Sequence, residues 1–99
     1  MQKEYKVIVN FYSPEYGGRK MSISVGYRPH FVSYGAIPTG DSMCGVQFVA
    51  LPSRLDMSKM IEAEVKFLYD GINYNQLLLG DKRFQIYEGP KIIGEGEFI

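Results

Sequence analysis

Apolar and polar residues alternate in several short segments of this chain. The clearest is residues 5–11, in which every second residue from Tyr5 to Phe11 is aromatic or a valine. Because successive side chains of a strand point to opposite faces, this pattern predicts a strand with one buried face. The same alternation predicts a strand over residues 21–25, which Gly26 ends.

Other strands are predicted from β-favouring residues and from the glycines and prolines that bound them. Residues 27–34 are expected to form an extended piece with a kink at Pro29, because proline keeps the residue before it extended. Residues 46–51 form the next predicted strand, and Pro52 ends it. The remaining predicted strands cover residues 83–87, 91–93 and 97–99, the last two separated by Gly94 and Gly96.

One segment, residues 53–69, fits two kinds of element. Its first part can cap and start a helix, and Ile61 and Val65 recur at helical spacing. Residues 61–69 also alternate strictly, which is typical of a half-buried strand. Periodicity alone leaves both interpretations open, including a short helix over residues 53–60.

Short strands, frequent turn glycines and at most one weak helix predict an all-β fold. With 99 residues the chain has room for a single domain, residues 1–99. A small antiparallel β-barrel of about six strands is favoured over a sandwich, because closure leaves no open sheet edge in so small a domain.

Composition limits the partners of this domain. Hydrophobic residues make up 45% of the chain and can supply a core, while 11 basic and 11 acidic residues give a formal net charge of zero. The chain therefore lacks the overall positive charge that holds duplex DNA or an anionic membrane. It shows no signal peptide and no apolar run of membrane-spanning length, so the cytoplasm is the expected location.

Candidate catalytic chemistry is sparse in the sequence. The chain has one cysteine, Cys44, and one histidine, His30. These numbers exclude an internal disulfide and a Cys/His metal cluster. Neither a nucleophile elbow nor a phosphate-binding glycine motif occurs, so we expect no enzyme, cofactor, metal or nucleotide site. Glu88, Glu95 and Glu97 could pair as acid and base, although acidic residues near a chain end are usually only solvated.

A glycine-rich corner precedes the second predicted strand. Gly17 and Gly18 free backbone amides beside the cations Arg19 and Lys20, and such a corner can bind a phosphate. For these four residues taken alone, an ordinary solvated hairpin turn is a commoner interpretation than a phosphate site.

Two longer motifs give the sequence a family resemblance. Residues 17–31 resemble the G-G-R-x-x-P-x-x-x-G-Y-R-P-x-F signature that opens the C-terminal β-barrel, or third domain, of elongation factor Tu. Residues 83–96 resemble the F-x-I-R-E-G-x-R-T-V-G-x-G motif that closes that domain. The resemblance covers essentially the whole chain and implies an antiparallel barrel, which favours a strand over residues 60–69. The family's GTP-binding domain has no counterpart in these residues, so no GTPase activity is implied.

The resemblance also implies candidate binding residues, because in elongation factor Tu this barrel touches the T-stem of aminoacyl-tRNA. Arg19 matches the family's arginine, and Lys20 stands where bacterial factors have a histidine. Glu88 matches a glutamate that faces the T-stem minor groove. His30 replaces a glutamine, and Lys91 keeps a positive charge of the closing motif.

These residues suit two functions. We expect foremost a non-catalytic module that binds a protein partner or assists translation, since its surface is neutral and its loops around Ile37 and Tyr74 look longer than the family's. The alternative is a weak binder of a tRNA-like stem, because three or four phosphate contacts without a positive field give salt-sensitive binding. The partner's identity and the oligomeric state stay open.

Overall fold

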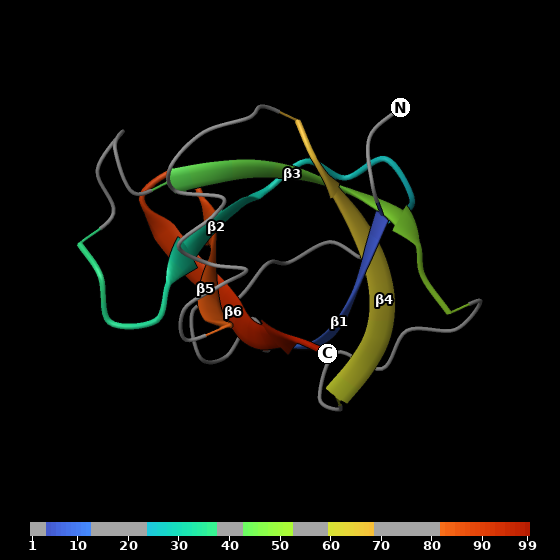
Figure 1. The fold of residues 1–99 in the computed structure, drawn as a ribbon. Coiled ribbons are helices and arrows are strands. Elements are labelled where there is room, and N and C mark those ends of the chain that lie inside the picture. The colour runs from blue at the N-terminus through green and yellow to red at the C-terminus, as the bar shows by residue number, and fades with distance from the viewer. Residues whose placement is uncertain (1–3, 13–23, 38–42, 53–59, 69–81) are drawn as a thin grey trace.

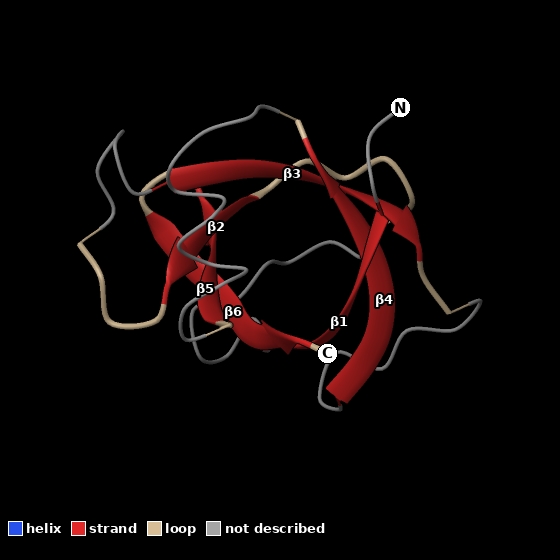
Figure 2. Cartoon of the chain, in the orientation of Figure 1, coloured by secondary structure: helices blue, strands red, loops and turns tan. Residues whose placement is uncertain are grey.

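A computed structural model describes residues 4–12, 24–37, 43–52, 60–68 and 82–99. Its regular elements there are strands, with no helix (Figure 2), so the predicted all-β class is confirmed. The six strands are β1 (Glu4–Phe11), β2 (His30–Ser33), β3 (Met43–Ala50), β4 (Met60–Phe67), β5 (Arg83–Glu88) and β6 (Lys91–Phe98).

The strands form a closed antiparallel barrel in the order β1-β4-β3-β2-β5-β6 (Figure 1). The last strand returns to the first, and Val7 of β1 stands opposite Phe98 of β6. The predicted small barrel is therefore confirmed. The segment that fitted both helix and strand is strand β4 from Met60 onward, between β1 and β3. Residues 53–59, where a short helix was considered, lie outside the described residues.

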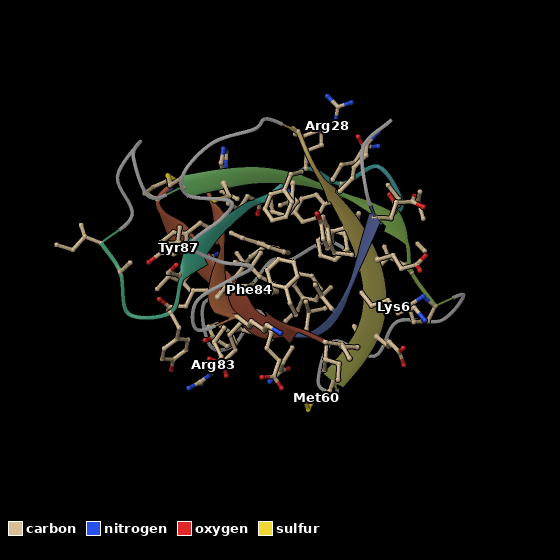
Figure 3. The ribbon with its side chains drawn as sticks, viewed as in Figure 1. Lys6, Arg28, Met60, Arg83, Phe84 and Tyr87 are labelled. Atoms are coloured by element: carbon tan, nitrogen blue, oxygen red, sulfur yellow. The ribbon has the colours of Figure 1, made fainter. Side chains whose placement is uncertain are left out.

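Aromatic side chains fill the interior of the barrel. The rings of Phe31 and Phe84 stack with centroids 3.9 Å apart, and Phe98 lies 5.2 Å from Phe84. Figure 3 shows Phe84 inside the ring of strands. These contacts join β2, β5 and β6 across the core. The other buried side chains with less than 2% of their surface exposed are Val7, Val9, Phe11, Val32, Val46, Phe48, Val65, Ile86 and Ile93.

The end of the chain differs from the prediction. Residues 91–98 form one continuous strand, so the predicted break at Gly94 and Gly96 is wrong. A Cβ on Gly94 would lie 2.6 Å from the carbonyl oxygen of Asn10. A Cβ on Gly96 would overlap the carbonyl oxygen of Ile8. The two glycines therefore serve the close approach of β6 to β1, and not a turn.

The region before β2 also departs from the predicted pattern. Ser24 and Val25 lie in a turn, where Gly26 has a φ of +96° and Tyr27 N donates to Ser24 O at 3.0 Å. The rest of the strand predicted over residues 21–25 lies outside the described residues. Residues 27–29 bond to β3, as in the 3.1 Å bond from Val46 N to Pro29 O. Of the extended piece predicted over residues 27–34, only His30–Ser33 forms a regular strand, and Tyr34 lies in a turn.

Two side chains outside the barrel interior are buried. Tyr87, which alternates with the core residues of its strand, is 4% exposed, and Val32 is fully buried. The register shift between Ile86 and Tyr87 adds an extra residue to β6, since Ile86 stands opposite Gly94 and Tyr87 opposite Ile92. Strand β5 itself keeps its alternation, so Tyr87 lies outside the ring of strands (Figure 3) and is nevertheless buried.

Candidate functional site

Three of the five residues predicted for binding lie together at one end of the barrel. His30 opens β2 and stands opposite Tyr87, which precedes Glu88 in β5. Glu88 in turn stands opposite Lys91 at the start of β6. We call these three residues the barrel-end cluster. Arg19 and Lys20, the other two predicted residues, lie outside the described part of the chain.

The barrel-end cluster has a mixed charge. Glu88 and Lys91 are exposed and flank the tight turn at Gly89, whose φ is +61°. His30 is half-buried between its neighbouring strands. One carboxylate and one ammonium group face each other across the hairpin, so the formal charges of this pair cancel.

A second candidate site lies on the outer wall of the barrel. The strand register aligns two rows of outward side chains across β5, β6, β1 and β4: Arg83, Glu97, Ile8 and Glu62 in one row, and Gln85, Glu95, Asn10 and Met60 in the next. A shallow hollow of about 210 Å³ runs over these rows. We call it the outer-wall groove; it is lined by Ile8, Asn10, Tyr34, Met60, Arg83, Glu95, Gly96 and Glu97.

An aromatic ring and a guanidinium group form one side of the outer-wall groove. Arg83 lies over the ring of Tyr34, with its guanidinium carbon 4.3 Å from the ring centroid. The backbone joins the same residues, because Tyr34 N donates to Arg83 O at 3.1 Å. Gly35, with a φ of +84°, turns the chain directly after Tyr34, and its N–H donates to Gln85 Oε1 at 3.4 Å. The ring is therefore fixed by contacts to β5 while 43% of its surface stays exposed.

The floor of the outer-wall groove is apolar. Ile8 is half-buried, and Met60 exposes 67% of its surface. Figure 3 shows Met60 and Arg83 pointing away from the ring of strands on the same side of the molecule. Gly96 lines the groove with its backbone, because a Cβ at this position would point towards Phe84 and Val9 in the core. Methionine is unbranched and polarizable, which suits it to adaptable contacts.

Two carboxylates face the outer-wall groove from β6. Glu95 and Glu97 are two residues apart in one strand and therefore share a face. The hydroxyl of Tyr12 hydrogen-bonds to Glu95. Burial of the phenol, together with the nearby negative charge of Glu95, raises the pKa of Tyr12 above 10.0. Tyr12 therefore keeps its proton at neutral pH and holds the Glu95 carboxylate at the groove.

The Cys44 thiol is buried and a poor nucleophile at neutral pH. Cys44 belongs to the barrel core, and burial raises the pKa of its thiol to about 11. Its thiolate is therefore scarce at neutral pH. Among the residues that the structure describes, no three histidine, cysteine, aspartate or glutamate side chains gather as a metal site. The described ranges also contain no helix that is long and apolar enough to cross a membrane.

Sequence reasoning missed most of the outer-wall groove. Alternation marks Ile8, Asn10 and Arg83 as outward, but it does not say which strands are neighbours. Only the barrel order brings β5, β6, β1 and β4 side by side. Glu95 and Glu97 were considered as an acid–base pair, whereas no motif pointed to Tyr34 or Met60.

Comparison with known proteins adds no relative: no protein-family model matches the chain, and no curated protein matches it. The molecule is therefore defined by its fold and not by a family, as a small closed antiparallel β-barrel. It carries a mixed-charge cluster at one end and a groove with apolar, aromatic and acidic residues on its wall.

Proposed function

We propose that this chain is a non-catalytic binding module that engages a protein partner through the outer-wall groove. The observation that carries the proposal is the exposed Met60 beside the fixed Tyr34–Arg83 pair. Tyrosine, methionine and arginine are enriched at protein interfaces, and tyrosine and arginine dominate their binding energy. A ring already held by a guanidinium group loses little conformational freedom when a partner covers it.

The composition of the outer-wall groove supports binding rather than catalysis. Among the described residues, its polar side-chain groups are two carboxylates, one amide, the hydroxyl of Tyr34 and a guanidinium that is already stacked on the Tyr34 ring. The single histidine and the buried thiol lie elsewhere, His30 at the barrel end and Cys44 in the core. The resemblance to the third domain of elongation factor Tu adds the expectation of an accessory role in translation, in the cytoplasm.

A direct test introduces the photo-crosslinking residue p-benzoylphenylalanine at Met60. Val25, which is 60% exposed in the turn of residues 24–27, is the control position. We expect one or a few proteins to crosslink from position 60, and the same bands to weaken when Tyr34→Ala is added. Crosslinks of equal pattern and yield from positions 60 and 25 would contradict the proposal.

A second candidate function is binding of a tRNA-like stem at the barrel-end cluster. The observation that favours it is the convergence of His30 with Glu88 and Lys91, a hairpin far from His30 in the sequence. The family resemblance adds Arg19 and Lys20 as further candidate cations. Filter binding of total tRNA at low salt tests it: we expect Lys91→Ala and Arg19→Ala each to weaken binding, whereas equal and poor binding by all three proteins would count against an RNA site.

A further inference from the structure

We infer that the outer-wall groove recognises an extended segment of its partner that carries lysine or arginine at alternate positions. The inference rests on the proposed function and specifies the chemistry of the partner. It follows from three features of the groove, namely its charge, its apolar floor and the spacing of its carboxylates.

Negative charge predominates around the floor. Ile8 stands between two exposed glutamates, Glu97 of β6 and Glu62 of β4. The next row adds Glu95, opposite Asn10. Among the described residues that line the groove, Arg83 is the one cation, and it lies over the ring of Tyr34 at the side. Glu62 and Lys6, which is exposed two positions before Ile8, lie just outside the lining. A chain with zero net charge thus presents a local excess of carboxylates here, which favours a cationic ligand and disfavours phosphate.

The floor suits the shape of a basic side chain. Lysine and arginine have long aliphatic stems that pack on apolar surface while the charged head remains at a polar rim. Ile8 and Met60 offer such a surface, and Glu97 and Glu62 stand on either side of Ile8. A stem that lies on Ile8 therefore brings its head within reach of a carboxylate.

The carboxylates have the spacing of an extended chain. Glu95 and Glu97 are two positions apart in β6, which corresponds to about 6.6–6.8 Å along a strand. Alternate side chains of an extended ligand have the same separation, so two of its cations can meet both carboxylates at once. The hydrogen bond from Tyr12 restrains Glu95 and lowers the cost of ordering it on binding.

The test uses calorimetric titration with two synthetic peptides at low salt. One peptide alternates lysine with valine, and the other alternates glutamate with valine. The variant is E95Q/E97Q, and the matched control is E4Q/E64Q, which removes two carboxylates of the same outer face that do not line the groove.

We expect the wild type and E4Q/E64Q to bind the lysine peptide equally and the glutamate peptide at least about tenfold more weakly. In E95Q/E97Q, the loss of two exposed ion pairs should weaken binding of the lysine peptide about twofold to thirtyfold. Equal binding of the two peptides by the wild type, or equal affinity of E95Q/E97Q and the control, would overturn the inference. Crosslinking from Met60 could still succeed in that case, so failure here is distinguishable from failure of the proposed function.

Discussion

Gly96 lies so close to Ile8 of the neighbouring strand that a methyl group on Gly96 would overlap the Ile8 carbonyl oxygen. The contact belongs to the pairing of β1 with β6, which closes the barrel. The same two residues line the outer-wall groove. The close approach that closes the barrel thus also sets the spacing of the two strands that carry Ile8, Glu95 and Glu97 of the groove.

Gly96→Ala should destabilise the fold. Besides the Ile8 carbonyl, the new methyl group would lie 2.9 Å from atoms of Phe84 and Val9, and overpacking of this kind costs about 1–3 kcal/mol. Each lost kcal/mol lowers the Tm of a domain of this size by about 4–8 °C, which thermal unfolding measures. Glu97→Ala, one residue further on the same strand but facing outward, is the control and should change stability by less than about 0.5 kcal/mol. Equal Tm values for the two variants would show that β1 and β6 are not so closely packed.

The buried thiol gives a prediction about pH. The pKa of Cys44 is raised by burial from 9.0 to about 11, so at pH 8 the folded protein has about a hundredfold less thiolate than the unfolded chain. A thiol reagent such as Ellman's reagent should therefore react at least about a hundredfold more slowly with native protein than with protein in denaturant. A comparable rate in both states would contradict burial of the thiol.

The same pKa shift links stability to pH. Above pH 9 the unfolded chain has released the thiol proton that the folded protein keeps, so the free energy of unfolding should fall between pH 9 and about 11. Other groups titrate in this range, so the relevant quantity is the difference between wild type and Cys44→Val in denaturant titrations. That difference should be constant below pH 9 and change above it.

Much of the fold could be predicted from the sequence because its strands have one wet and one dry face. Residues 5–11 alternate without interruption, and β1 occupies that segment. The segment around Ile61 was ambiguous, since a helix and a strand can both place Ile61 and Val65 on one face. Pairing on both sides makes it β4. Alternation gives the direction of a side chain but not its burial, since the outward Tyr87 is only 4% exposed.

The outer-wall groove could not be predicted in the same way. Its lining comes from β1, β4, β5, β6 and the turn after β2, segments that are distant in the sequence. Gly94 and Gly96 look like turn formers, and only the nearby Asn10 and Ile8 carbonyls explain them. The barrel-end cluster could be predicted in part, because Glu88 and Lys91 flank a Gly-Pro turn that is recognisable in the sequence.

The hydrogen bond between Tyr12 and Glu95 predicts a second titration effect. Burial raises the pKa of Tyr12, and the negative charge of Glu95 raises it further. Glu95→Gln should lower the pKa of Tyr12 towards 10.0 without restoring it fully, because burial remains. Difference spectra of phenolate absorbance, with Tyr12→Phe to identify the signal among the 8 tyrosines, measure it. An unchanged Tyr12 titration in Glu95→Gln would show that the two side chains do not interact.

The stacked pair at the side of the outer-wall groove predicts a coupling energy. Arg83 and Tyr34 should show about 0.5–1 kcal/mol of interaction in a double-mutant cycle with Arg83→Gln and Tyr34→Leu. Denaturant unfolding of the four proteins supplies the cycle. Strict additivity of the two substitutions would mean that the guanidinium group does not hold the ring.

The most direct test of the outer-wall groove as a binding site is a two-dimensional NMR titration of the labelled protein with the lysine–valine peptide. The backbone amide signals of Ile8, Asn10, Glu95, Gly96 and Glu97 should move together and saturate at one affinity, while those of His30, Glu88 and Lys91 stay in place. Shifts confined to the barrel-end cluster, or no saturable shifts at all, would contradict binding of a basic extended segment at the groove.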